Sequence, residues 1–288
     1  MVLTGCDDSA FLVGGYDGKT RFADAFLWTD DSFRAVNLVG GEHPFVGRAG
    51  HVMVRIGIDS FVVALGYESD RSLLGDAVRV TLNRETLQAA LHPLAHSGNP
   101  RRWACAGMLM NESLMCVAGG WNEKGPTMDV QLYDVLRDTW SDLTCAGPGP
   151  KPRRWAASDV IGGKLVIQGG YDGAATPLGD AWALDVVAGR WMKLPWTDRR
   201  ASRHTLCHGH LIGGFGENEA ILRHHAVLDL ENHPLENDIE FVSQVEKNWY
   251  RAGHSSVFLP LESSVLTVGG FVGGEKRRLV LDEHKKYL

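Results

Sequence analysis

The pattern of apolar and polar positions repeats along this chain. A short apolar run ends in glycine and is followed at once by an aromatic residue. The copies span residues 11–16, 61–67, 114–121, 165–171, 210–215 and 266–271. Short apolar runs bounded by glycine predict buried β-strands that stop in tight turns. The copies follow one another at intervals of roughly 50 residues, a period typical of repeat architectures.

Further segments recur around each apolar run. An Arg-led segment precedes the run, beginning at Arg48, Arg102, Arg154, Arg203 and Arg251. After the glycines an Asp opens an alternating strand, as at Asp24, Asp76, Asp129 and Asp180. In two units an Asp turn leads to Trp140 or Trp191, and we expect both indole rings to be buried. These segments predict four short strands per unit, and ringing six such units around an axis buries faces that one unit cannot bury alone.

These residues resemble the kelch-repeat family over the whole chain, because glycine pair, Asp, turn and Trp recur in that order. The resemblance implies an all-β fold, a six-bladed kelch-type β-propeller with four antiparallel strands per blade, in a single domain over residues 1–288. Three units depart from the pattern. Gly66 lacks its glycine partner, His225 stands where Asp is usual, and Arg277 or Arg278 does so in the last unit.

Composition narrows the class of protein. Hydrophobic residues make up 44% of the 288 residues and charged residues 22%, a globular balance. No stretch approaches the roughly 18 apolar residues of a membrane helix. Residues 1–8 lack the basic start and apolar run of a signal peptide. We therefore expect a cytoplasmic, monomeric protein with no membrane partner, and the net charge of −6 argues against general nucleic-acid binding.

The aromatic residues after the glycines are candidate partner contacts. They are Tyr16, Tyr67, Trp121, Tyr171, Phe215 and Phe271. In kelch propellers this position opens onto the face around the central channel, so the resemblance implies a converging aromatic ring. Such rings offer a large contact surface. The alternative is that each ring only packs against the neighbouring blade.

The leading arginines are the second set of candidates. The resemblance implies that Arg48, Arg102, Arg154, Arg203 and Arg251 point into one pocket at the same face. A group of guanidinium ions suits bidentate recognition of carboxylate or phosphate. The alternative is that each arginine joins its blade to the next through a carboxylate or a backbone carbonyl. In the fifth unit Arg200 could replace Arg203.

Metal and cofactor chemistry is not indicated. His208 and His210 share one face of a strand, but no Cys or carboxylate stands at a recognisable ligand spacing. No phosphate-binding glycine loop is present, and the glycine pairs are explained by strand termination. We therefore expect no metal and no cofactor.

One segment is enzyme-like. Residues 216–227 resemble the catalytic stretch of the bacterial N-acetylneuraminate epimerase family, which is also built as a six-bladed kelch propeller. The resemblance implies that Glu217 would move a proton while Arg223 holds a sugar carboxylate. A sugar-acid isomerase is thus the alternative to our leading hypothesis. That hypothesis is a non-catalytic protein–protein interaction module, or scaffold, which binds a short acidic or phosphorylated segment at its central face.

The cysteines generate a first prediction. Cys6, Cys105, Cys116, Cys145 and Cys207 are scattered and odd in number, which suits a reducing compartment. Titration with a thiol reagent under denaturing, non-reducing conditions should therefore count all five thiols. A count of three or fewer would contradict the prediction.

Overall fold

The computed structural model describes most of the chain. The described residues are 2–6, 9–40, 44–70, 72–94, 101–174, 176–195, 199–222, 225–228, 241–243, 252–259 and 264–270. Strands dominate them, and the 3-10 turn η1 (Glu217–Glu219) is the one helical element among them. No helix in this part of the chain is long and apolar enough to cross a membrane.

The first two units form one eight-stranded sheet in the order β1-β2-β3-β4-β10-β9-β6-β5. The first contains β1 (Val2–Cys6), β2 (Ser9–Val13), β3 (Ala25–Thr29) and β4 (Ser32–Val39). The second contains β5 (Val52–Gly57), β6 (Ser60–Ala64), β9 (Ala77–Asn83) and β10 (Gln88–Pro93). Within each unit neighbouring strands are antiparallel, whereas the outer strands β4 and β10 pair in parallel across the two units.

The next three units are separate four-stranded antiparallel sheets. The third contains β11 (Ala106–Leu109), β12 (Leu114–Ala118), β15 (Val130–Asp134) and β16 (Thr139–Leu143). The fourth contains β17 (Ala157–Ile161), β18 (Lys164–Gln168), β19 (Ala181–Asp185) and β20 (Arg190–Lys193). The fifth contains β21 (Thr205–Cys207), β22 (His210–Ile212), β23 (His225–Leu228) and β24 (Phe241–Ser243).

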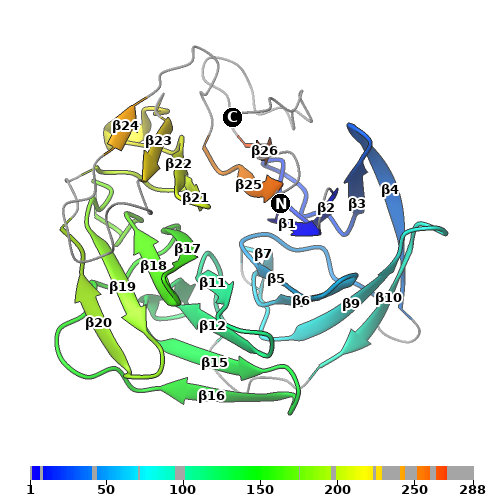
Figure 1. The fold of residues 1–288 in the computed structure, drawn as a ribbon, viewed down its shortest axis with the longest axis horizontal. Helices are drawn as coiled ribbons and strands as arrows, with labels where there is room; N and C mark the ends of the chain where they lie inside the picture. Colours follow the sequence, from blue (N-terminus) through cyan, green and yellow to red (C-terminus); the bar gives the residue numbers. More distant parts are fainter. Residues whose placement is uncertain are drawn as a thin grey trace.

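A last pair, β25 (Ser255–Leu259) and β26 (Ser264–Val268), closes the set of described sheets. The sheets stand around an axis with β1, β5, β11, β17, β21 and β25 innermost (Figure 1). This strand-rich, curled arrangement fits a β-propeller. Residues 271–288 lie outside the described residues, so six blades of four strands each stay a prediction.

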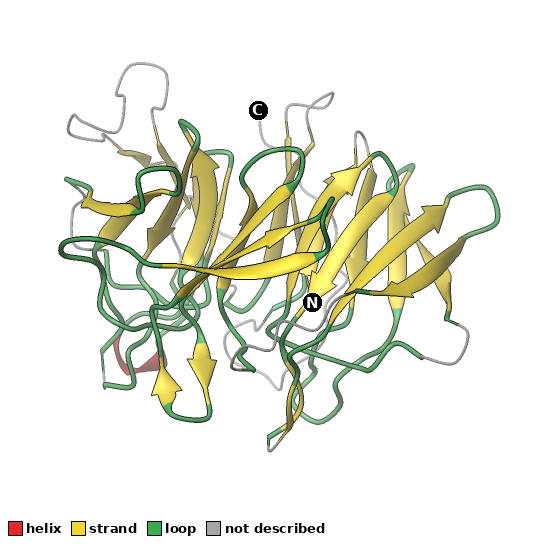
Figure 2. Ribbon diagram, turned by 90° about the horizontal axis from the view of Figure 1, so that it is seen from below, coloured by secondary structure: helices red, strands yellow, loops and turns green. Residues whose placement is uncertain are grey.

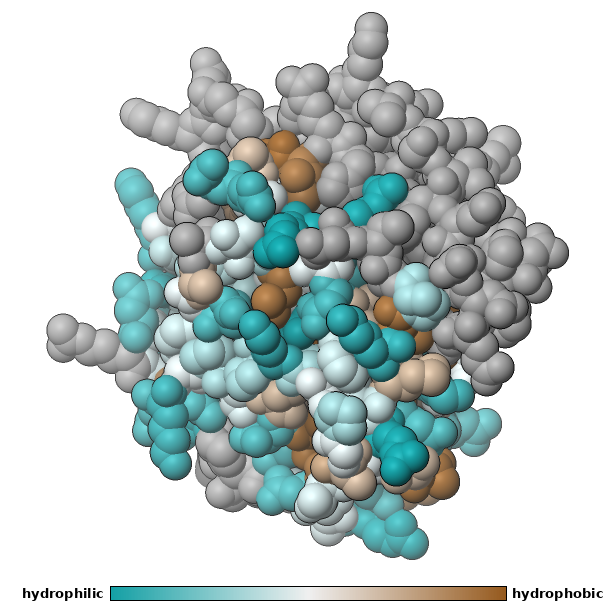
Figure 3. Space-filling view, turned by 90° about the vertical axis from the view of Figure 1, so that its left-hand side faces the viewer, coloured by the Kyte–Doolittle hydropathy of each residue, from teal (hydrophilic) through white to brown (hydrophobic). Residues whose placement is uncertain are grey.

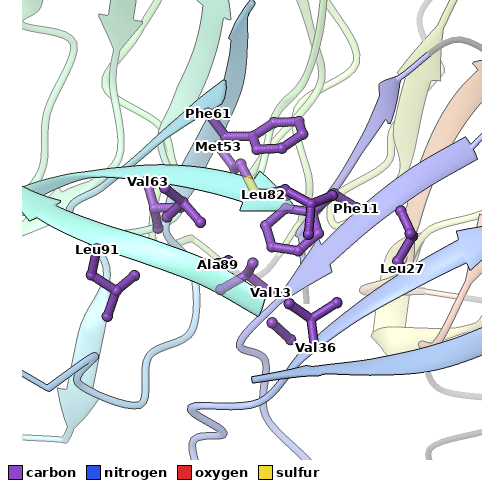
Figure 4. Packing of buried hydrophobic residues seen from close by; sticks show 12 residues of the cluster. Phe11, Val13, Leu27, Val36, Met53, Phe61, Val63, Leu82, Ala89 and Leu91 are labelled. Atoms are coloured by element: carbon purple, nitrogen blue, oxygen red, sulfur yellow. The ribbon is translucent and has the colours of Figure 1, made fainter. Parts of the chain in front are cut away.

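The burial pattern explains why these segments form strands. The second strand of each unit is a continuous apolar run, and β2 is buried at every position because a neighbouring sheet covers each of its faces. The outer strands β4 and β10 instead alternate exposed and buried residues. Between the first two units Phe11 stacks on Phe61 with ring centroids 4.8 Å apart, inside a core shared by both sheets (Figure 4).

One face of the ring carries the long loops. We call it the loop face, and define it by residues 16–24, 67–76, 121–129, 171–180 and 215–222, which connect the second and third strands of each unit. Hairpins β7 (Tyr67–Ser69)–β8 (Ser72–Leu73) and β13 (Trp121–Asn122)–β14 (Gly125–Pro126) belong to these loops. Short hairpins and η1 project on this side, at the bottom of Figure 2.

The outer side of the ring, near β19 and β20, is mostly polar. Seen from the edge where β19 and β20 lie, polar residues cover most of the described surface and apolar residues are interspersed (Figure 3). Exposed apolar side chains such as Leu136 and Val187 stand at turns between outer strands. Scattered apolar residues are normal on soluble proteins, so the rim gives no indication of a binding site.

The two predicted structural tryptophans differ in burial. Trp191 is 6% exposed and packs in the core between the third and fourth units. Trp140 packs beside Tyr133, with centroids 4.9 Å apart, but it is only partly buried. The expectation that Trp140 is buried like Trp191 is therefore corrected. Both rings stand on outer strands, but Leu143, Cys145 and Gly149 of the preceding unit cover Trp191.

Truncation of these side chains should reflect this difference. Trp191→Ala should lower the free energy of unfolding by about 3–5 kcal/mol, because it empties a closed core. Trp140→Ala should cost about 1–2 kcal/mol, in proportion to the smaller apolar area that it buries. Denaturant melts of both variants test the ranking, and an equal or reversed effect would contradict it.

Candidate functional site

Two of the candidate arginines are buried inside the sheets. Arg48 is fully buried and forms a bidentate ion pair with Asp76, at 2.9 and 2.7 Å, while it also donates to the carbonyl of Leu65. Arg102 is 1% exposed and donates to the carbonyls of Gly119 and Asp129. The prediction that both arginines contact a partner is therefore corrected, because neither guanidinium reaches solvent.

A third arginine, which the sequence analysis passed over, occupies the same position in the fourth unit. Arg153 is 1% exposed, pairs with both carboxylate oxygens of Asp180 and donates to the carbonyl of Gly169. Burial alone would raise the pKa of Asp180, but the hydrogen bonds from Arg153 and Trp182 outweigh it and hold that pKa below its usual value. Arg48, Arg102 and Arg153 thus brace the ends of the second strands.

The backbone of these residues joins adjacent units. The N–H of each second glycine donates to the carbonyl of the residue at the buried-arginine position of the next unit. These bonds join Gly15 to Arg48, Gly66 to Arg102, Gly120 to Arg153 and Gly170 to Ala201, at 2.8 to 2.9 Å. The glycine pairs are accordingly structural, as their recurrence in the sequence suggested.

Arg154 and Arg203 lie in a different register. Arg154 follows the buried position by one residue, and Arg203 follows its equivalent, Ala201, by two. Both are partly exposed, and their guanidinium groups lie over aromatic rings that begin the loop-face segments. The sequence therefore grouped arginines that the structure separates into buried braces and loop-face cations.

The loop-face aromatics form a continuous arc. Ring centroids are 6.3 Å apart between Tyr16 and Tyr67, and 4.5 Å between Tyr67 and Trp103. The arc continues from Trp103 to Trp155 at 5.2 Å, and from Trp155 to Tyr171 at 6.4 Å. Three of the candidate aromatics therefore lie in this arc, and it gains two tryptophans that the sequence analysis did not select.

Arg154 is held against four rings of this surface. Its guanidinium carbon lies 3.9 Å from the ring centre of Trp155, 4.2 Å from Trp121, 5.1 Å from Trp103 and 5.5 Å from Tyr171. Burial lowers the pKa of Arg154 from its ordinary value. Its Nε is buried without a hydrogen-bond partner, and no ion pair found among the described residues includes it. A guanidinium group in such a position can bind an anion through charge-assisted hydrogen bonds.

Two other arginines flank this position. Arg203 stacks 3.6 Å from the centre of Trp155 and 5.6 Å from that of Phe215. Arg21 lies over Tyr16 and Tyr67, at 4.4 and 4.9 Å, and forms an ion pair with Asp70. Arg21 is thus neutralised by a carboxylate of the neighbouring hairpin.

The remaining candidates fall in two places. Arg251, Phe271 and Arg223 lie outside the described residues. Glu217 begins η1 on the loop of the fifth unit. Trp103, Trp155 and Arg21 were missed because the first two stand inside the Arg-led segment, where they looked like part of the repeat. The sequence did offer one signal for the two tryptophans. The equivalent positions differ between units and hold Ala49 and Gly50 in the second unit.

The axis contains a cavity of about 1140 Å³ lined by all six innermost strands. A chain of hydrogen bonds runs along one wall, from His254 Nε2 to Thr205 Oγ1 at 3.0 Å, to Ser256 Oγ at 2.9 Å and to Thr267 Oγ1 at 2.9 Å. Within the described ranges no group of three His, Cys, Asp or Glu side chains could hold a metal ion. The cavity is therefore polar along this wall.

The fold and this surface define a β-propeller with a cationic and aromatic arc on its loop face. The chain belongs to the kelch-repeat family, because the family model described as "KLHDC2/KLHL20/DRC7 Kelch-repeats domain" matches residues 1–212. Kelch domains generally serve as protein-interaction modules.

Curated relatives match smaller parts of longer proteins. Identity is 39% over 66 residues with serine/threonine-protein phosphatase BSL2 of Arabidopsis thaliana, covering 23% of this chain and 6% of that protein. It is 25% over 189 residues with acyl-CoA-binding domain-containing protein 5 of the same plant, covering 62% and 28%. It is 28% over 164 residues with the dynein alpha chain of the flagellar outer arm of Chlamydomonas reinhardtii, covering 52% and 4%. The matches thus span less than a third of each relative's own length.

A buried histidine near the axis makes stability depend on pH. His51 is 5% exposed, and burial, assisted by the charge of Arg48, lowers its pKa well below 6.5. The folded state therefore keeps His51 neutral where the unfolded chain protonates it, so stability must fall as pH falls below about 6.5. Cys105 occupies the equivalent position in the third unit, which makes His51→Cys a conservative replacement.

The predicted result is a flatter pH profile in His51→Cys. Between pH 6.5 and 5, His51 should contribute a loss of up to about 1.4 kcal/mol per pH unit. Denaturant melts at several pH values should show this slope in the natural protein and a smaller slope in the variant. Identical slopes would show that His51 does not titrate with unfolding.

Proposed function

We propose that this chain is a non-catalytic protein-interaction module whose loop face binds a short acidic or phosphorylated segment of another protein. In this proposal the chain forms a six-bladed propeller with four strands per blade, acts as a monomer and needs no cofactor. The observation that carries the proposal is the environment of Arg154. It is a partly buried cation held by four aromatic rings and by no carboxylate of the described residues.

Electrostatics support an anionic partner in spite of the net charge of −6. Local cations govern recognition at short range, because salt screens exposed charges more than about one Debye length away, roughly 8 Å at physiological ionic strength. Arg154 and Arg203 both lie over Trp155, so two guanidinium groups share one ring. A carboxylate or phosphate at the edge of that ring would offset their charge and accept charge-assisted hydrogen bonds.

The relatives support a binding role that the same type of domain performs in different proteins. Their printed names denote a phosphatase, an acyl-CoA-binding protein and a dynein chain, and this chain corresponds to a small part of each. A segment shared by proteins with such different names fits a module that brings partners together. The kelch family match does not favour the sugar-acid isomerase. Of its two proposed residues, Glu217 lies in η1 and Arg223 lies outside the described residues.

Peptide binding tests the proposal. The probes are fluorescein-labelled peptides of six glutamates, of six glutamines, and of a phosphoserine flanked by glycines. We expect the glutamate or the phosphoserine peptide to bind at least tenfold more tightly than the glutamine peptide, with affinity falling as salt rises. Arg154→Met should weaken that binding about tenfold, which corresponds to about 1.4 kcal/mol, and should leave the melting temperature nearly unchanged.

Arg101→Met is the matched control. Arg101 is exposed, and no aromatic contact is found for it within the part of the chain that the structure describes, so its removal deletes the same charge without disturbing the aromatic arc. This variant should lose less than twofold in affinity. Equal binding of the glutamine peptide, or an equal loss in both arginine variants, would refute recognition of an anion at Arg154.

A further inference from the structure

Five equivalent backbone positions surround the mouth of the channel, and their side chains differ sharply. Gly50, Ala104, Trp155, Arg203 and Gly253 all have left-handed backbones, with φ of 61°, 56°, 56°, 54° and 70°. From Ala104 onward each N–H donates to the carbonyl of the preceding member, at 2.7 to 3.0 Å, so four bonds link the five peptide positions from unit to unit.

The backbone requires no side chain at these positions. Glycine adopts a left-handed conformation freely, whereas a Cβ introduces steric strain that grows for bulky residues. Two of the five positions are glycine, and they make the same bonds as the others. Trp155 and Arg203 are therefore unfavourable choices for the fold alone, and strained residues of this kind concentrate at functional sites.

The residues immediately before these positions show the same asymmetry. Ala49 and Ala252 precede the two glycines, whereas Trp103 precedes Ala104 and Arg154 precedes Trp155. The large side chains thus form one cluster over the third to fifth units. We call it the Trp–Arg cluster, and its members are Trp103, Arg154, Trp155 and Arg203. Its members are in contact through the ring of Trp155.

We propose that Trp155 and Arg203 are retained to bind the anionic group of the partner, and that this group binds off the axis, over the fourth and fifth units. The inference rests on the proposed function for the nature of the partner, and it assigns the anion to one side of the face. The indole of Trp155 covers the guanidinium groups of Arg154 and Arg203 and orients their N–H edges toward an oxygen ligand, either carboxylate or phosphate.

The opposite side of the face is unsuited to an anion. Arg21 is already paired with Asp70, whose side chain is 86% exposed, and an exposed carboxylate repels a second anion. Tyr16 and Tyr67 provide apolar contact there. The site therefore combines an anion-binding half with an aromatic half.

Glycine substitutions separate binding from folding. Trp155→Gly removes the indole and the backbone strain together, and Ala104→Gly is the matched control at the equivalent position of the third unit. We expect both variants to melt within about 3 °C of the natural protein. Trp155→Gly and Arg203→Met should each weaken binding of the glutamate or phosphoserine peptide at least tenfold. Ala104→Gly should change it less than twofold.

Small anions provide a readout that does not need a peptide. In ¹⁵N spectra of the arginine side chains, acetate or inorganic phosphate should shift the Nε resonances of Arg154 and Arg203 in the natural protein and in Ala104→Gly. Trp155→Gly should lose these shifts. Shifts with acetate alone would identify a carboxylate ligand, and shifts with phosphate alone a phosphate ligand.

The outcomes distinguish this inference from the proposed function. Anion shifts that depend on Trp155, without any peptide binding, would support the off-axis site and overturn the peptide-binding function. Peptide binding that is equal in the natural protein and in Trp155→Gly would overturn the inference and leave the function standing. If Trp155→Gly lowers the melting temperature as far as Trp191→Ala does, Trp155 is structural and the inference is overturned. If neither peptide nor anion binds, both proposals are overturned.

Discussion

The hydrogen bond between a glycine N–H and the carbonyl at the buried-arginine position of the next unit holds the ring together. It requires close approach of two backbones, and a Cβ added to Gly14 would lie 2.7 Å from the carbonyl oxygen of Arg48. At Gly119 the equivalent distance, to the carbonyl oxygen of Arg153, is 2.9 Å. In the second unit Leu65 takes the first glycine position and adopts φ of 65° itself, so the backbone geometry survives the loss of the glycine.

The arginines illustrate how one residue type serves two purposes in the same repeat. Arg48 and Arg153 are buried, and their charge is offset by carboxylates and carbonyls of their own units. Arg154 is the immediate neighbour of Arg153, yet its charge is held by aromatic faces. Successive residues of an extended chain point to opposite sides, so a shift of one position converts a structural cation into one that faces the partner.

The repeat period predicted a repeat architecture, and the glycine pair, Asp, turn and Trp that recur within each unit supplied the resemblance to the kelch family. The candidate site was predicted less well. Tyr16, Tyr67, Trp121 and Tyr171 lie on the loop face, and their contact with a partner stays a prediction, whereas Arg48 and Arg102 proved to be buried. Sequence could not separate the two arginine classes, because adjacent arginines at 153 and 154 and the shorter fifth unit leave the register undetermined. The edge-to-face contact of Trp103 with Trp155, far apart in the sequence, has no local signal at all.

The bonds around the channel mouth are made by peptide groups alone, and this has a consequence for how binding specificity can change. Every residue type except proline offers the same N–H and C=O, so the bonds that join the units do not depend on which other side chain stands there. Glycine, alanine, tryptophan and arginine already occupy equivalent places in one molecule. Substitution at a single unit can therefore give the face a new partner while the joints between units stay as they are, and each blade is free to diversify separately.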